Sequence, residues 1–219
     1  MTKPPKRRIG RPPLSGPEAE QNPLHALSHE ERRTLFLETA AKLFEQKGYA
    51  STSVEDITNA LGFTKGVFYY YWNTKLEILE EIGRRGIQAM HDRLCAGIAD
   101  DTSPAERLEA AIANHIDTVT QRRPIIAVLL SDSLVSDVII EGHKRYARRF
   151  QEIVEDGIAA GVVRDMDPQI LTYAILGLCN SIVRWYQPSR RLSADEVRTL
   201  FMEFAAKGWR ADAIPPSGA

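Results

Sequence analysis

The chain has 219 residues, of which 43% are hydrophobic and 26% charged, and its formal net charge is −1. This composition is that of an ordinary globular protein of one or two domains, and the net charge neither favours nor excludes nucleic acid as a partner. No apolar run reaches the ~20 residues that span a bilayer, and the basic N-terminus lacks the apolar part of a secretory signal, so we expect a cytoplasmic protein. Cys95 and Cys179 lie far apart in apolar helical patterns and predict neither a disulfide nor a metal site.

The N-terminal segment, residues 1–28, is expected to be disordered by itself, because it is rich in proline and cannot bury apolar surface. Its basic residues all precede the first acidic residue, Glu18; they are Lys3, Lys6, Arg7, Arg8 and Arg11. Composition alone is compatible with a solvated tail or with an arm that binds nucleic acid.

Capping signals and apolar spacing predict an all-α protein. Ser28, Ser103 and Ser193 each stand three residues before a glutamate, which is the capping-box pattern of a helix start. No alternating run bounded by Asn-Gly or Asp-Gly predicts a β-hairpin. We expect about nine helices, at residues 29–47, 53–60, 64–70, 75–98, 104–122, 124–135, 137–160, 168–187 and 193–209.

Two of these helices, 53–60 and 64–70, are short and are joined by a glycine-bearing turn, which is the helix-turn-helix pattern. The second helix is expected to present its first residues, Thr64, Lys65 and Gly66, outward to the DNA major groove. A lysine there can donate to guanine, and the threonine hydroxyl can hold a phosphate.

Five consecutive aromatic residues follow, from Phe68 to Trp72. Consecutive residues point in every direction around a helix, so one buried face cannot hold them all. Phe68 and Trp72 are four apart and share a face, so we expect both in the core. Tyr69 and Tyr70 are then expected to face outward, where a phenol hydroxyl reaches the phosphate backbone.

The stretch TSVEDITNALGFTKGVFYYYWNTKLEIL resembles the DNA-binding region of the tetracycline-repressor (TetR) family of bacterial regulators. The resemblance extends from about Glu30 to Met90 and departs from the family pattern at Val67, Tyr71 and Trp72. It implies a DNA-binding domain at residues 29–90 with its helix-turn-helix at 53–72. It also implies that Thr52 or Ser53 caps the second helix and contacts phosphate, and that Lys75 holds another phosphate. The remaining contacts implied are to base edges or backbone, from Lys65, Gly66, Val67, Tyr69, Tyr70 and Tyr71.

The basic arm contains KRRIGRPP, which partly resembles the AT-hook, with Ile9 in place of the first arginine of that motif. An arm that precedes a DNA-binding domain lies near the adjacent minor groove, whose narrow A·T geometry favours arginine. We therefore expect Arg7, Arg8 and Arg11 to contribute to DNA binding.

The rest of the chain is expected to form a second domain at residues 91–210, followed by a tail at 211–219. The resemblance implies that this domain dimerises and binds a small molecule. Two features predict the dimer interface. The helix after Pro168 has a row of small residues, Ala174, Gly177 and Ser181, and the last helix has an apolar stripe that includes Leu200, Phe204 and Gly208. A two-fold dimer places two recognition helices ~34–36 Å apart and requires a palindromic operator.

The central helices are apolar enough to enclose either a cavity or a dry core. The stretch GLCNSIVRWYQPSRRLSADEV resembles the equivalent part of TetR-family members that respond to acyl-CoA from fatty-acid or sterol catabolism. It implies a small apolar effector of that class, and the residues proposed to bind it are Met90, His115, Ile116, Phe150, Asn180, Arg184 and Trp185.

Catalytic constellations and cofactor motifs are missing from the sequence, so we expect neither an enzyme nor a bound cofactor. The histidines show no local cluster of the kind that a metal site leaves. Two functions remain open: a dimeric repressor controlled by a ligand, and a ligand-independent architectural DNA-binding protein.

Overall fold

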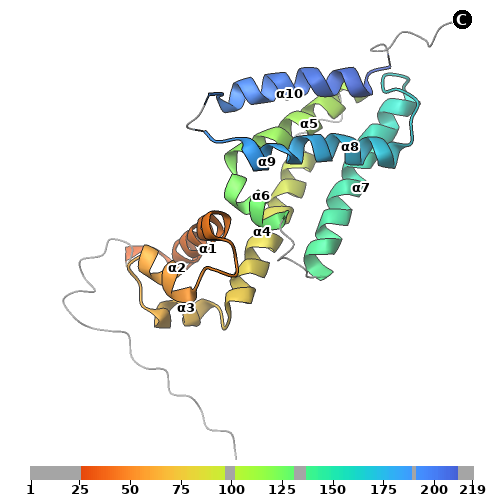
Figure 1. Ribbon diagram of the computed structural model, residues 1–219. Helices are drawn as coiled ribbons and strands as arrows, with labels where there is room; N and C mark the ends of the chain where they lie inside the picture. Colours follow the sequence, from red (N-terminus) through yellow and green to blue (C-terminus); the bar gives the residue numbers. More distant parts are fainter. Residues whose placement is uncertain (1–25, 97–101, 131–136, 189–190, 212–219) are drawn as a thin grey trace, which may run out of the picture.

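The computed structural model describes residues 26–96, 102–130, 137–188 and 191–211. Within these ranges the fold consists of ten helices and no β-sheet, since the one β-bridge, between Val163 and Arg210, is isolated (Figure 1). The all-α prediction is confirmed. Almost all of the predicted basic arm, with Arg7, Arg8 and Arg11, and the tail from residue 212 lie outside the described ranges.

Three helices form a small head: α1 (His29–Lys47), α2 (Val54–Ala60) and α3 (Lys65–Tyr71). Their common core contains Phe36 and Phe68, both fully buried, together with Ile57 and Phe63. The rings of Phe36 and Phe63 stack with centroids 5.5 Å apart. Because aromatic packing of this kind fixes both distance and orientation, it sets α2 and α3 against α1.

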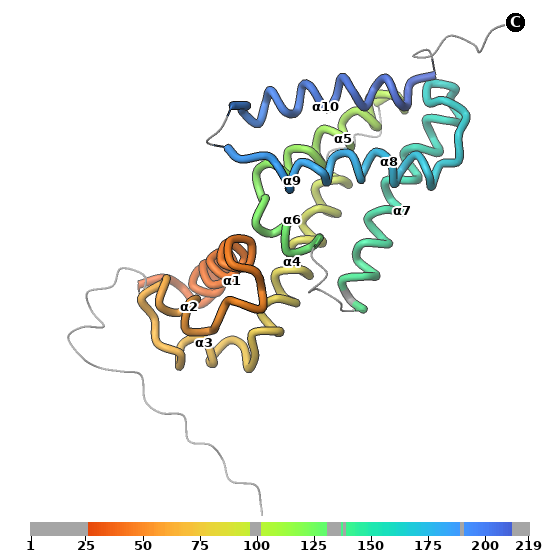
Figure 2. Tube along the Cα trace, in the orientation of Figure 1, coloured from red at the N-terminus to blue at the C-terminus, as the bar shows by residue number. Residues whose placement is uncertain are grey.

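Helix α4 (Lys75–Ala96) is long and belongs to both parts of the molecule. It leaves the head beside α3 and runs into the body (Figure 2). The body is completed by α5 (Pro104–Gln121), α6 (Arg123–Leu129), α7 (Asp137–Ala159), α8 (Pro168–Asn180), α9 (Ile182–Trp185) and α10 (Ala194–Trp209). None of the described helices is long and apolar enough to cross a bilayer.

Serine caps start several of these helices, as the sequence predicts. Ser28, Ser103 and Ser193 each accept a hydrogen bond from the backbone of the glutamate three residues on, and each glutamate carboxylate accepts from the serine backbone N–H. The backbone N–H groups of the serine and of the glutamate have no partner within the helix, and the capping box satisfies both at each helix start.

The predicted helix at 168–187 is wrong in one respect, because it forms two helices, α8 and α9, with Ser181 between them. The Ser181 hydroxyl donates to the carbonyl oxygen of Leu178 at 2.6 Å. A serine side chain that takes a backbone carbonyl competes with the regular helical ladder and favours a break.

Two glycines let α4 approach its neighbours in the body. A Cβ atom on Gly86 would lie 2.7 Å from Cγ2 of Ile125 in α6, and a Cβ on Gly142 in α7 would lie 2.9 Å from Cγ2 of Ile87 in α4. Real Cβ atoms do not come so close to a neighbour, so the close approach of the helices at both positions requires glycine, which has no side chain. The middle of α4 is therefore clamped between α6 and α7.

Candidate functional site

The head presents the start of α3 to solvent. Gly62 takes a positive φ of 67° in the turn after α2, a conformation that suits glycine, and this turn leads into α3. Thr64 precedes α3 as its N-cap, and its side chain makes no capping hydrogen bond. Thr64, Lys65 and Gly66 are all exposed, and Val67 is half-buried.

The row of aromatic residues, Phe68 to Trp72, contains both buried and exposed side chains, as predicted. Phe68 is 0% and Trp72 3% exposed, whereas Tyr69 is 53% and Tyr70 72% exposed. Trp72 also donates from Nε1 to Oε2 of Glu81 at 2.7 Å, which ties α3 to α4. Tyr71 is half-buried, and its hydroxyl donates to the backbone carbonyl of His29 at 3.3 Å. The side chains of Tyr69 and Tyr70 are therefore exposed on the helix whose first residue is Lys65.

Salt bridges hold the cationic side chains of this surface. Lys65 lies 2.7 Å from the carboxylate of Glu55, and both side chains are more than half exposed. This pairing, a hydrogen bond and a charge interaction, raises the pKa of Lys65. On the other side of α2, hydrogen bonds from Ser53 and Lys47 lower the pKa of Asp56 to about 2. Exposed pairs of this kind are weak, so Lys65 can exchange Glu55 for another acceptor.

Ser53 caps α2, and its hydroxyl accepts from the backbone N–H of Asp56 at 3.0 Å. Thr52, the other candidate for this cap, is 1% exposed, and its hydroxyl donates to the carbonyl of Gly48 at 2.9 Å. Its side chain therefore cannot reach a phosphate. The expectation for Thr52 is corrected to a structural role in the loop before α2.

Lys75, which is expected to hold a phosphate, makes internal contacts in this structure. Its ammonium donates to the carbonyl oxygens of Tyr49 and Thr52, both at 2.6 Å, and lies 4.2 Å from the centroid of the Tyr49 ring. The donors of Lys75 are thus used to fasten the start of α4 to the loop between α1 and α2. These contacts could not be predicted from the sequence, because every residue has a backbone carbonyl oxygen.

The body contains a cavity of about 500 Å³ between α4, α5, α6, α7 and α8. Its inner wall is apolar, with Ile87, Met90, Ile126, Leu129, Ile139 and Leu176 all buried. Ile140, Lys144 and Tyr173 are exposed at its rim. A volume of this size with apolar walls suits a small organic ligand.

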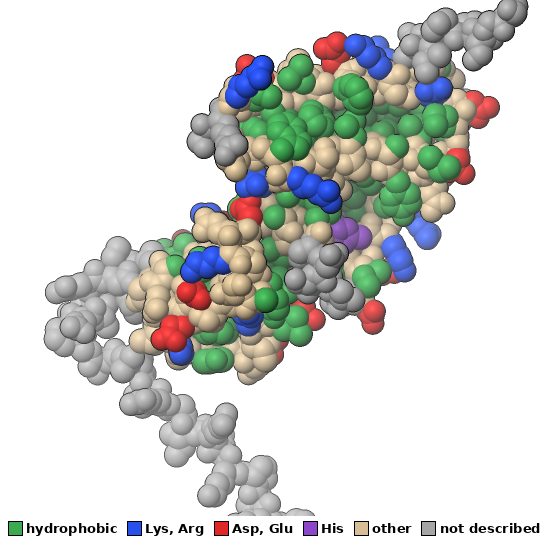
Figure 3. Space-filling view, in the orientation of Figure 1, with side chains coloured by type: hydrophobic (Ala, Val, Ile, Leu, Met, Phe, Trp, Pro, Cys, Tyr) green, Lys and Arg blue, Asp and Glu red, His purple; other side chains and the backbone are tan. Residues whose placement is uncertain are grey.

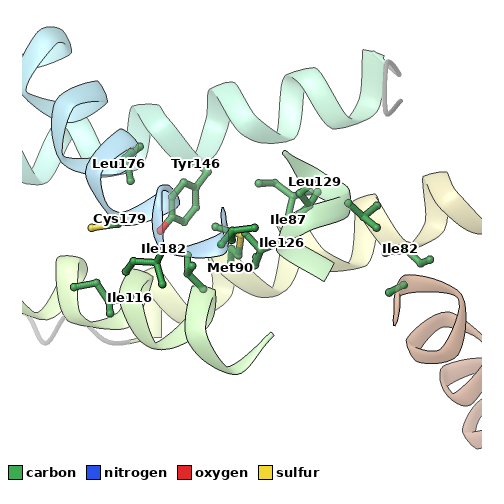
Figure 4. Packing of buried hydrophobic residues seen from close by; sticks show 14 of the residues in the cluster. Ile82, Ile87, Met90, Ile116, Ile126, Leu129, Tyr146, Leu176, Cys179 and Ile182 are labelled. Carbon is green, nitrogen blue, oxygen red and sulfur yellow. The ribbon is translucent and has the colours of Figure 1, made fainter. Parts of the chain in front are cut away.

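The polar part of this cavity is a chain of three side chains centred on His115. The Tyr146 hydroxyl lies 2.7 Å from Nδ1 of His115, and Oδ1 of Asn180 lies 3.0 Å from Nε2 of the same ring. Tyr146 projects from α7 into the packed interior beside Met90 and Leu176 (Figure 4). Burial lowers the pKa of His115 to about 4, although the hydrogen bond to Asn180 acts in the opposite direction. The ring is therefore neutral at physiological pH.

The structure brings only some of the expected ligand-binding residues to the cavity. Met90, His115 and Asn180 line it. Ile116 and Phe150 are fully buried in the core without lining it, and Arg184 and Trp185 are exposed on α9. These four residues do not line this cavity, and their contact with an effector stays a prediction. Among the lining residues that were not expected, those on α7 have a signal in the sequence, because the spacing of Ile139, His143 and Tyr146 marks one helix face.

A second feature of the body is an exposed apolar face on α8 and α10. Tyr173 is 56%, Leu200 53% and Phe204 67% exposed, and hydrophobic side chains gather over both helices (Figure 3). The expected interface residues Ala174, Gly177 and Gly208 are exposed as well, and Ser181 is half-buried. Contiguous apolar surface of this kind marks an interaction site.

Head and body are joined directly as well as through α4. Arg123 at the start of α6 forms an ion pair with Glu45 of α1, and its Nε donates to the carbonyl of Val183 in α9 at 3.0 Å. A single arginine side chain of α6 therefore contacts both the head and α9. Among the described residues no group of three or more acidic, cysteine or histidine side chains could hold a metal ion.

Comparison with known proteins relates both parts of the chain to bacterial regulators. Residues 36–82 match the family model "Bacterial regulatory proteins, tetR family", and residues 101–209 match "Tetracyclin repressor-like, C-terminal domain". The transcriptional repressor KstR2 of Mycolicibacterium smegmatis is 26% identical over 184 residues, which are 81% of this chain and 90% of KstR2.

Two solved structures extend the similarity to three dimensions. A regulator of the TetR/AcrR family from Thermobifida fusca is 32% identical, with a TM-score of 0.65 over 82% of this chain and 99% of its own. AibR, solved in complex with isovaleryl coenzyme A and operator DNA, is 25% identical, with a TM-score of 0.72 over 82% of this chain and 98% of its own.

Proposed function

Because the chain belongs to the TetR family of bacterial regulatory proteins, we propose that it is a homodimeric transcriptional repressor released from its operator by a small apolar ligand. Its relatives are helix-turn-helix regulators and not enzymes, and its head has the helix-turn-helix that DNA binding requires. With operator DNA as its partner, the protein would act in the cytoplasm.

DNA binding is proposed for the surface at the start of α3. Lys65, Gly66 and Val67 would face base edges in the major groove, with Thr64 and Ser53 holding phosphates. The exposed hydroxyls of Tyr69 and Tyr70 would reach the DNA backbone, and Tyr71 would lie beside them. The basic arm, with Arg7, Arg8 and Arg11, would enter the adjacent minor groove.

The exposed face on α8 and α10 would be the dimer interface. Ala174, Gly177 and Gly208 have no large side chains, so helices of a second copy can approach them closely. Leu200 and Phe204 would supply apolar area to the same interface. A two-fold dimer built in this way would bind a palindromic operator.

The effector would be an acyl-CoA thioester. AibR, which shares this fold, was solved with isovaleryl coenzyme A, and the stretch from Gly177 to Val197 resembles acyl-CoA-responsive members of the family. The apolar inner wall suits an acyl chain, and Lys144 at the rim suits a phosphate group outside the cavity.

The observation that carries the proposal is that α4 belongs to both sites. Its residues Ile87 and Met90 line the cavity, while Glu81 holds Trp72 of the head at 2.7 Å. A ligand that favours a different position of α4 would move the heads relative to each other. It can shift the equilibrium only by the difference between its affinities for the two states.

The proposal is tested by fluorescence anisotropy with the DNA that flanks the protein's own gene, with and without long-chain or steroid acyl-CoA. We expect tight binding that the thioester weakens. Tight binding that no thioester changes would remove the effector class and leave the repressor. Weak binding to every sequence alike, with a steep salt dependence, would favour the architectural alternative, because a repressor shows a specificity ratio of ~10³ or more.

A further inference from the structure

The cavity offers an uncharged interior to its ligand. Of the residues that line it, Lys144 alone carries a full positive charge, and it is exposed at the rim. Burial lowers the pKa of His143, which disfavours the charged form of this side chain. A carboxylate taken inside would be a buried charge without a charged partner, which is strongly unfavourable. The inner end of a ligand must therefore be neutral.

The orientation of the Asn180 amide sets the direction of each hydrogen bond in the chain centred on His115. The ring is neutral, so one nitrogen donates and the other accepts. Nε2 faces the amide oxygen of Asn180 at 3.0 Å, which can only accept, so Nε2 donates. Nδ1 must then accept from the Tyr146 hydroxyl at 2.7 Å. In this arrangement the Tyr146 hydroxyl donates, His115 accepts at Nδ1 and donates at Nε2, and the Asn180 amide oxygen accepts.

This orientation leaves the NH₂ group of Asn180 as a donor at the cavity wall. Asn180 lines the cavity and is half-buried, and no described residue accepts a hydrogen bond from its amide nitrogen. The surrounding wall is formed by apolar side chains such as Met90 and Leu176. A partly buried donor in an apolar wall binds an acceptor far better than it binds an alkyl group.

We propose that Asn180 donates a hydrogen bond to a carbonyl oxygen of the effector, with His115 and Tyr146 as positioning residues that hold its amide in place. Asn180 lies one helical turn beyond Gly177, at the edge of the cavity, while Ile87 and Leu129 lie on the apolar wall. The acyl chain would enter the apolar part, its carbonyl would meet Asn180, and the charged remainder would pass Lys144 to solvent. This inference rests on the proposed function, and it adds that the protein selects a thioester over a free acid or a thioether.

The test compares two ligands that differ only in the carbonyl, octanoyl-CoA and its thioether analogue S-octyl-CoA, by isothermal titration calorimetry with the full chain. One neutral hydrogen bond is worth a preference of about tenfold, so we expect octanoyl-CoA to bind about tenfold more tightly. Octanoate, the free acid, is expected not to bind in the cavity.

Two variants assign this preference to Asn180. Asn180→Leu removes the NH₂ donor and the amide oxygen at similar side-chain volume, and Asn180→Ala removes both without adding apolar area. Both should reduce the ratio of thioester to thioether affinity to about one, with binding of S-octyl-CoA and of DNA retained. His115→Gln should lower the same ratio, whereas general damage to the fold would weaken both ligands alike.

The possible failures are distinguishable. Equal binding of the thioester and the thioether to the wild-type protein, or an unchanged ratio in Asn180→Leu, would overturn this inference and leave the repressor with its acyl-CoA effector. Failure of both CoA ligands to bind would overturn the effector class of the proposed function, and this inference with it.

Discussion

Tyr70 shows what a single exposed side chain contributes to the head. It is among the most exposed large residues of the described chain, although its neighbours Phe68 and Trp72 are buried. Tyr70→Phe removes the hydroxyl and keeps the ring, so we expect an unchanged melting temperature and a several-fold loss of DNA affinity. The loss should be similar for operator and unrelated DNA, because a phosphate contact carries no sequence information. A loss confined to the operator, measured by anisotropy, would assign the hydroxyl to a base edge.

His115 determines part of the pH dependence of stability. Its pKa is lowered by burial from an ordinary value of 6.5 to about 4 in the folded protein. Between these values the unfolded chain binds a proton that the folded chain does not. The contribution of His115 to the free energy of unfolding is therefore fully present above pH 6.5 and is lost as pH falls toward 4. His115 alone should remove about 1.4 kcal/mol per pH unit within this window.

The measurement is urea unfolding at pH 7, 6 and 5 for the wild-type protein and His115→Gln. The variant should be less stable at pH 7 but should lose less stability on acidification. The remaining slope would include His143, whose pKa is also lowered by burial. Identical slopes for the two proteins would show that folding does not lower the pKa of His115.

At the scale of the helix, Gly86 controls how closely α4 and α6 approach. Gly86→Ala would place a Cβ atom 2.7 Å from Cγ2 of Ile125 and 3.1 Å from Cδ1 of Leu129, so these side chains or the helices themselves must shift. We expect a loss of about 1–3 kcal/mol in the free energy of unfolding. Gln88→Ala on the exposed side of the same helix should stay within about 0.5 kcal/mol of the wild type. Equal effects of both substitutions in urea titrations would contradict a tight α4–α6 contact.

The helices could be predicted from the sequence because their signals are local. Serine caps and apolar spacing act within a few residues. The buried and exposed residues between Phe68 and Trp72 could be told apart because their positions around one helix also depend only on local spacing. Contacts between distant segments could not be predicted: Lys75 bonded to carbonyls of the α1–α2 loop, or His115 between Tyr146 and Asn180, depend on how helices cross. The break at Ser181 was missed because the sequence around it is favourable to a helix on both sides.

At the scale of the whole molecule, the exposed face of α8 and α10 is proposed to hold two copies together. Phe204→Glu places a charge at the centre of this face and should convert the dimer to a monomer, with operator binding lost and helical content kept. Thr199→Glu adds the same charge to an exposed position on another side of α10 and should change neither. Analytical ultracentrifugation measures the mass of each protein in solution. A Phe204→Glu protein that remains a dimer would show that the interface is not on this face.

A ligand bound in the cavity is proposed to change the spacing of the two heads. The distance between spin labels on Asn59→Cys, an exposed position of α2, measured by double electron–electron resonance, reports this spacing. The exposed Cys95 is replaced by serine for this purpose, and the buried Cys179 is kept. We expect one narrow distance distribution without ligand, compatible with heads one DNA turn apart, and a shifted distribution with saturating octanoyl-CoA. An unchanged distribution with the ligand shown to be bound, or no coupling between labels at all, would contradict the account.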